Sequence, residues 1–274
     1  NQIPNDIYLI EKNNKFRFVK KRASVFEYEF RNVQNSIDFQ LKTEDILSPY
    51  YKLSLIEKPI INHLSMGLEF PNYTQKKNEV VKNGGDIIIP EGTVVTWKIR
   101  SSFVNKIHFK TKDSTIFIQS SDNENKHKKK VRNDLNYSII PEGSNSVLGN
   151  EMNYKIKVIK DKYPKIKVTT IIDSINPLML FHSGIIADDY GFKKLYFNYR
   201  NNDTIGKIII PVPKNTFQHK FNYGLNIKEI GFDLGDEFTY YFEVFDNDGI
   251  NGSKSAKSTL KSFKVSSEKE IERL

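Results

Sequence analysis

Residues 94–100, which read Val-Val-Thr-Trp-Lys-Ile-Arg, decide the fold class of this chain. Val95, Trp97 and Ile99 stand at every second position, so in an extended strand they share one face while polar side chains occupy the other. An apolar face opposite a polar face is typical of a strand that separates a hydrophobic core from solvent. The stretch therefore predicts a half-buried β-strand.

The same alternation recurs along the chain, and helical periodicity is almost absent. Residues 192–200 place Leu195, Phe197 and Tyr199 on one side, and residues 238–245 repeat the pattern. Turn sequences rich in Gly, Asn, Asp and Pro separate these runs. The sequence therefore predicts an all-β fold of tandem antiparallel sandwiches of the immunoglobulin-like or fibronectin III-like kind.

The composition excludes several classes of protein. Among 274 residues, 42 Lys+Arg against 33 Asp+Glu give a net charge of +9, and 38% hydrophobic residues exclude a wholly disordered chain. No stretch approaches the roughly 20 apolar residues that a membrane-spanning helix needs. The absence of cysteine excludes disulfides and cysteine metal sites.

An internal repeat divides the chain into domains. The segment from Tyr51 to Pro59 recurs loosely from Tyr154 to Pro164, at an offset of 103 residues, which is about the length of one immunoglobulin-like sandwich. Each copy reads as a last strand, a short linker and the first strand of the next domain. We therefore predict an N-terminally truncated β-domain at 1–58 and complete sandwiches at 59–162 and 163–266.

Strands within the first and third domains follow from the alternation. They are predicted at 7–10, 16–19, 25–30, 37–41, 51–56, 165–170, 178–186, 192–200, 207–212, 216–223, 238–245 and 260–265. The pattern then changes, because Ser267 and Glu270 have the spacing of a capping box. We expect a helical region to begin at 267–274.

Several separated motifs resemble one family of bacterial envelope proteins. They are Phe26–Phe30 with Ile37–Phe39, Ile89–Thr93 with Trp97, Ile159–Pro164, Gly184–Phe192 and Tyr241–Ser258. In this order and spacing they resemble the Bacteroidetes-type membrane-anchored proteins of domain-of-unknown-function family 4175. The resemblance implies tandem immunoglobulin-like domains between upstream membrane helices and a long downstream helical region. It thus implies a periplasmic location with attachment to the inner membrane, and it supplies no catalytic residues.

Acidic residues are expected to converge at one end of the third domain. In such a sandwich the second and sixth strands end in loops at the same end, which brings Asp188 and Asp189 near Asp246 and Asp248. The incoming linker adds Asp161. Clustered carboxylates repel one another unless a cation compensates, so the set predicts a calcium site that resembles cadherin-like interdomain sites. Alternatively, Asp and Asn before Gly bind backbone amides in tight turns without any ion.

Other chemistry has little support in the sequence. The five histidines are widely separated, which argues against a transition-metal site; they are His63, His108, His127, His182 and His219. Hydrolase and phosphate-binding motifs are absent from the sequence. We therefore predict a non-enzymatic protein without a cofactor other than calcium.

A basic run forms a second candidate site, for anionic ligands that carry phosphate groups. It comprises Lys126, Lys128, Lys129, Lys130 and Arg132. The alternative is a solvated hairpin loop. Because no aromatic residues interleave with the lysines, we do not expect a nucleic-acid partner.

The tandem sandwiches favour a scaffold that spaces and presents binding surfaces, and the resemblance implies that it does so in the periplasm, for another envelope protein. One alternative is a carbohydrate- or peptidoglycan-binding module, which would need an exposed aromatic platform. Tyr196, Tyr199 and Tyr241 are its candidates. The other alternative is an adhesin-like module stiffened by calcium at the acidic junction.

Overall fold

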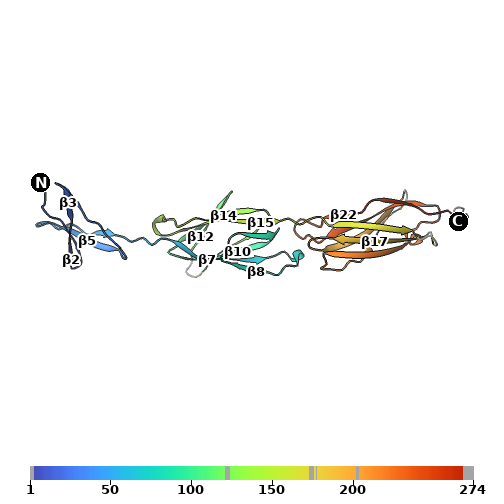
Figure 1. Ribbon diagram of the computed structural model, residues 1–274, viewed down its shortest axis with the longest axis horizontal. Coiled ribbons are helices and arrows are strands. Elements are labelled where there is room, and N and C mark those ends of the chain that lie inside the picture. The colour runs from blue at the N-terminus through green and yellow to red at the C-terminus, as the bar shows by residue number, and fades with distance from the viewer. Residues whose placement is uncertain (1–2, 121–123, 173–175, 177, 202–203, 268–274) are drawn as a thin grey trace.

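Figure 1 shows the computed structural model of the chain, which describes residues 3–120, 124–172, 176, 178–201 and 204–267. Three groups of strands follow one another along an elongated molecule, and the two termini lie at opposite ends. The described residues form sheets that are antiparallel except for one strand pair, with three short 3-10 helices and no α-helix, so the predicted all-β class of tandem sandwiches is confirmed. The predicted helix start lies outside the described residues except for Ser267. No helix in the described ranges has the length and apolarity to cross a membrane.

The N-terminal unit is small and contains little buried surface. Its four-stranded sheet has the order β2-β1-β5-β6, and β3 and β4 form a separate hairpin. Leu9 is its fully buried apolar residue, and a row of ring contacts runs from Phe16 through Tyr28 to Phe30. Its strands are β1 (Tyr8–Glu11), β2 (Asn14–Arg17), β3 (Val19–Arg22), β4 (Val25–Glu27), β5 (Ile37–Lys42) and β6 (Tyr51–Leu53).

The central sandwich packs two sheets around Trp97. Val95, Trp97 and Ile99 are each 0% exposed, which confirms the inward face expected from their alternation. The Trp97 ring lies 4.8 Å from Phe109 and 5.3 Å from Tyr137, both on the facing sheet. The sheet orders are β13-β10-β7-β8 and β12-β11-β14-β15-β9, and β9 runs parallel to β15. The elements are β7 (Ile60–Glu69), η1 (Asn72–Thr74), β8 (Glu79–Lys82), β9 (Ile87–Pro90), β10 (Val94–Ser102), β11 (Lys106–Thr111), β12 (Thr115–Gln119), β13 (Asn125–Lys130), β14 (Leu135–Glu142), η2 (Ser144–Ser146) and β15 (Met152–Ile159).

The C-terminal sandwich has an aromatic core between two sheets. One sheet has the order β16-β17-β20; the other has the order β19-β18-β21-β22, and β23 also pairs with β21. Phe197 and Phe242 pack with ring centroids 5.2 Å apart at its centre. Its elements are β16 (Lys165–Ile172), β17 (Met179–Ala187), β18 (Phe192–Arg200), β19 (Ile205–Ile210), β20 (Gln218–Asn226), η3 (Ile227–Ile230), β21 (Glu237–Asp246), β22 (Ser255–Lys257) and β23 (Lys261–Lys264). β22 was not predicted, because it is only three residues long and follows a loop rich in Gly, Asn and Ser.

Strand register brings two loops to one end of the C-terminal sandwich. β18 and β21 are antiparallel, and Phe192 at the start of β18 pairs with Asp246 at the end of β21. The β17–β18 loop and the β21–β22 loop therefore leave the sheet side by side. Lys165 at the start of β16 pairs with Ala187, so the linker from β15 enters at the same end. The predicted domain limits stay predictions, but the linker between β15 and β16 spans residues 160–164.

His182 is a buried titratable group in the core of this sandwich. Its residue is 2% exposed, its Nδ1 lies 3.1 Å from Thr170 Oγ1, and its Nε2 is buried without a hydrogen-bond partner. Burial, assisted by the positive charge of Lys261, lowers the pKa of His182 to about 4. The folded state thus excludes a proton that the unfolded chain binds below pH 6.5.

We expect acid to destabilise the C-terminal sandwich through His182. Between the unfolded pKa of 6.5 and the folded pKa of about 4, the unfolded state binds more protons than the folded state. The free energy of unfolding therefore decreases as the pH is lowered through this range. The loss is up to about 3 kcal/mol. Calorimetry of the wild type and of His182→Gln across this pH range measures the loss of stability. Trp97 fluorescence shows which melting transition belongs to the central sandwich.

The comparison with His182→Gln is necessary because Asp161 and Asp188 have raised pKa values, which produce the opposite pH dependence. Subtracting the variant's curve isolates the histidine. A stability difference between the two proteins that stays constant with pH would contradict the assignment.

Candidate functional site

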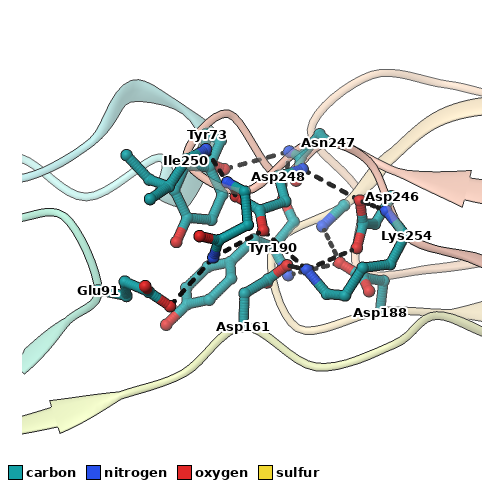
Figure 2. A network of polar contacts seen from close by, with 12 residues as sticks. Tyr73, Glu91, Asp161, Asp188, Tyr190, Asp246, Asn247, Asp248, Ile250 and Lys254 are labelled. Carbon is teal, nitrogen blue, oxygen red and sulfur yellow. Dashed lines mark hydrogen bonds and ion pairs between the residues drawn. The ribbon is translucent and has the colours of Figure 1, made fainter. Parts of the chain in front are cut away.

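The candidate site lies where the central and C-terminal sandwiches meet, and Figure 2 shows its polar network. Three segments supply it besides the central sandwich: the linker, the β17–β18 loop and the β21–β22 loop. The residues involved are Tyr73, Gln75, Glu91, Gly92, Asp161, Asp188, Asp189, Tyr190, Asp246, Asn247, Asp248, Ile250, Asn251 and Lys254.

Apolar side chains interlock across the junction. Tyr73 in η1 meets Tyr190 of the β17–β18 loop edge to face, with ring centroids 5.3 Å apart, and both residues are more than nine-tenths buried. Ile250 packs on Gly92, where a Cβ atom would lie only 2.5 Å from Ile250 Cδ1. Gly92 also has a φ of +83°, so both its backbone and its neighbour require glycine.

Hydrogen bonds cross the same interface. Asn247 Nδ2 donates to the backbone oxygens of Tyr73, at 3.1 Å, and of Tyr190, at 2.9 Å. Gln75 Nε2 donates to the Tyr190 oxygen at 2.8 Å. Asn251 Nδ2 donates to Glu91 Oε2 at 3.1 Å. The junction is thus held by side chains from both sandwiches.

Lys254 is a cation inside the acidic loops. Its Nζ lies 3.1 Å from Asp246 Oδ2 and 2.8 Å from Asp248 Oδ2, and it also pairs with Asp161 Oδ2 of the linker. The lysine side chain is 16% exposed and the three carboxylates are at most 1% exposed. Burial alone would lower the pKa of Lys254, but the three carboxylates raise it above its usual value, so the ammonium form is retained.

Asp161, Asp188 and Asp189 form a second group beside this lysine. One carboxylate oxygen of each lies within 4.8 Å of the others. Burial raises the pKa of Asp161 to about 7 although Lys254 opposes the shift, and burial also raises the pKa of Asp188. Nearby carboxylates add to both shifts. Lys254 therefore does not offset the burial and mutual repulsion of these carboxylates.

Some of the carboxylates accept hydrogen bonds from backbone amides in tight turns, as the alternative interpretation predicts. Asp248 Oδ1 accepts from the amides of Ile250, at 2.7 Å, and Asn251, at 3.2 Å. Asp188 Oδ2 accepts from the amides of Tyr190, at 2.9 Å, and Gly191, at 2.8 Å. Both oxygens of Asp248 are engaged, because Oδ2 pairs with Lys254, so this residue belongs to the loop rather than to an ion.

The structure therefore places all five predicted carboxylates at one junction but divides them. Asp161, Asp188 and Asp189 group together, whereas Asp246 and Asp248 surround Lys254. The convergence of loops also places Asn247 beside the aspartates, but Lys254 was not predicted as a site residue. A signal for the lysine was present, since it lies in the same predicted loop, eight residues after Asp246.

The basic run is not a hairpin loop. Lys126, Lys128 and Lys130 lie on the outer face of β13, whereas Lys129 shares the other face with His127, which stacks on Trp97 at 5.5 Å. The loop interpretation was wrong because alternate residues of this edge strand face the core. Lys128 is also paired with Glu69 at 2.9 Å. The five predicted residues thus divide between two faces, and exposed Arg132 follows the strand.

The predicted aromatic platform is covered by lysines. Tyr196 and Tyr241 lie on the outer face of the β18–β21 pair and are half-buried. Lys207 Nζ lies 5.1 Å from the Tyr196 ring centre, and Lys257 Nζ lies 5.0 Å from the Tyr241 ring centre. Tyr199 packs against the core. These rings do not form an open flat surface.

Comparisons with known proteins leave the family open. No family model and no curated protein matches the chain. Similar solved structures include a candidate carbohydrate-binding protein from Bacteroides uniformis (9% identity, 60% of this chain and 89% of that chain, TM-score 0.28). A second is the set of fibronectin(III)-like modules of Clostridium thermocellum CbhA, with 14% identity, coverage of 67% of this chain and 89% of that chain, and a TM-score of 0.23. A third is the FN1–FN3 region of chicken CNTN1, with 9% identity, coverage of 95% of this chain and 88% of that chain, and a TM-score of 0.25. Such low TM-scores carry no argument about function, and the resemblance to family 4175 stays a prediction.

Lys254→Met is expected to destabilise the junction. Removing the ammonium leaves three buried carboxylates without their partner, which costs about 3–5 kcal/mol. Calorimetry in chelating buffer, above the pKa of Asp161, measures the loss. Lys257→Met is the matched control, because that side chain is 58% exposed and lies 4.0 Å from Glu243. Its expected cost is about 1 kcal/mol or less. Equal losses in the two variants would contradict the role assigned to Lys254.

Proposed function

We propose that this chain is a non-enzymatic spacer and interaction region of an envelope protein. One observation carries the proposal: Asn247 of the C-terminal sandwich donates hydrogen bonds to a carbonyl of each sandwich and so ties the two together. A spacer must hold distance, and inter-domain motion is the default unless such contacts oppose it. The elongated arrangement in Figure 1 fits this role.

The two junctions of the molecule differ in a way that suits a spacer with one pivot. Residues 54–58, between the N-terminal unit and the central sandwich, are all exposed. Lys58 makes one surface hydrogen bond there, to Asn150 at 3.0 Å. The second junction instead buries Tyr73 and Tyr190 and contains the Lys254 ion pairs. We expect stiffness at the second junction and bending at the first.

The periplasmic location and an envelope-protein partner rest on the resemblance to family 4175. Glycan binding is the second candidate, and the lysines above Tyr196 and Tyr241 weigh against an aromatic platform on that face. Anionic glycans or lipids remain candidate ligands for the outer face of β13 through Lys126, Lys128 and Lys130.

Spin-label distances test the spacer directly. The chain has no cysteine, so spin labels attach only to cysteines that are introduced by substitution. Labels at positions 130 and 209, in place of Lys130 and Ile209, span the second junction, and labels at positions 38 and 130, in place of Asp38 and Lys130, span the first. We expect a narrow distance distribution across the second junction and a broad one across the first. Asn247→Ala should broaden the second distribution because it removes the hydrogen bond to Tyr73 across the interface and the bond to Tyr190 that holds the Asn247 side chain in place.

Asn222→Ala is the control, since Asn222 is exposed on β20. It should leave both distributions unchanged. Equally broad distributions across both junctions in the wild type would remove the basis of the spacer proposal.

The location has a separate test. In cells that express the complete protein, protease added to spheroplasts should degrade this region while a cytoplasmic marker protein survives. Protection of the region together with the marker would overturn the periplasmic assignment.

A further inference from the structure

Three carboxylates meet at the junction, and each of them has one buried oxygen without a hydrogen-bond donor. One oxygen each of Asp161, Asp188 and Asp189 lies within 4.8 Å of the others. In each residue Oδ1 is buried and has no hydrogen-bond partner. Buried polar atoms are almost always satisfied, so three such oxygens on neighbouring carboxylates require an explanation.

Unpartnered atoms elsewhere in the described chain are scattered, whereas these are concentrated. Of ten buried side-chain N and O atoms without a hydrogen bond in the described residues, six belong to the linker and loops of this junction: the Oδ1 atoms of Asp161, Asp188, Asp189 and Asn247, Ser253 Oγ, and Asp246 Oδ2, which is ion-paired with Lys254. The Asp161 side chain is only 1% exposed, so water reaches it poorly. Asn247 contributes a neutral amide oxygen, and its Nδ2 is already engaged with Tyr73 and Tyr190.

The local charge also calls for a cation. Five aspartates contribute −5 and Lys254 contributes +1, which leaves −4 when all are ionised. Lys254 is occupied by Asp246, Asp248 and the Oδ2 atom of Asp161. Asp188, Asp189 and the second oxygen of Asp161 are thus left without a cation, and like charges this close repel strongly.

We infer that the carboxylates of Asp161, Asp188 and Asp189 together bind one calcium ion. The donor set is all oxygen, which calcium prefers. Two oxygens bound to one calcium ion lie at most about 5.2 Å apart, twice the longest usual Ca–O distance, and one oxygen of each of the three carboxylates meets that limit. Magnesium requires shorter distances and a stricter octahedron.

Lys254 and the ion have complementary roles in this arrangement. The ammonium holds Asp161 Oδ2 from one side, and calcium binds its other oxygen together with the β17–β18 loop. The linker is thereby fixed to the C-terminal sandwich by two cations. The inference goes beyond the spacer function, because ion binding is measured separately from the stiffness of the junction.

Calorimetric titration of the full chain with calcium chloride tests the site. We expect one ion per chain with a Kd of about 10⁻⁴–10⁻³ M, typical of extracellular modules, and a higher melting temperature of the C-terminal sandwich in calcium than in chelator. Asp189→Asn should weaken binding roughly tenfold or more, because it removes one charged ligand. In chelator the same variant should melt no lower than the wild type, since it relieves repulsion.

Asp113→Asn is the matched control, an exposed aspartate of the central sandwich that should leave calcium binding unchanged. Terbium gives a second readout, because Tyr190 lies beside Asp189 and can sensitise its luminescence. Calcium should displace terbium, and Tyr190→Phe should dim the signal. Absence of heat, melting shift and displaceable luminescence at millimolar calcium would overturn the site, as would equal binding by wild type and Asp189→Asn. A preference for magnesium would overturn the choice of ion.

Discussion

The backbone pairing of Phe192 with Asp246 is the constraint on which the junction depends. It aligns the start of β18 with the end of β21, so the two loops that follow β17 and β21 must leave the sandwich together. The pairing of Lys165 with Ala187 brings the linker to the same place. The convergence of charge at this end follows from sheet register, and the ion pairs of Lys254 follow from that convergence.

Much of this architecture is accessible from the sequence because it depends on local periodicity and on connectivity. The alternation around Trp97 predicts which face is buried, and that face is the core of the central sandwich. The chain order of strands in a sandwich predicts which loops are neighbours, so Asp188 and Asp246 could be placed together without coordinates. Residue type and spacing are sufficient for both inferences.

The remainder depends on side-chain positions that no local pattern encodes. From sequence alone, a lysine in a polar loop is expected to lie on the surface. The fold of the loop buries Lys254 among the aspartates, and the sequence pattern does not predict this. The donation from Asn247 to two backbone carbonyls depends on the relative placement of two sandwiches. The basic run was interpreted as a loop for a related reason, because consecutive lysines are unusual in a strand. An edge strand tolerates lysines on its outer face, where they also protect the edge from pairing with other chains.

The parallel pairing of β9 with β15 has a mechanical consequence. Ile87 pairs with Ile156 and Pro90 pairs with Ile159, and the strands of this sandwich run roughly along the long axis of the molecule, as Figure 1 shows. Tension between the two termini enters this sandwich at the start of β7 and leaves it at the end of β15, so β15 is pulled along its own length past β9. The hydrogen bonds between them are then loaded in shear and must break together rather than one after another. Shear loading of this strand pair opposes extension of the central sandwich along that axis.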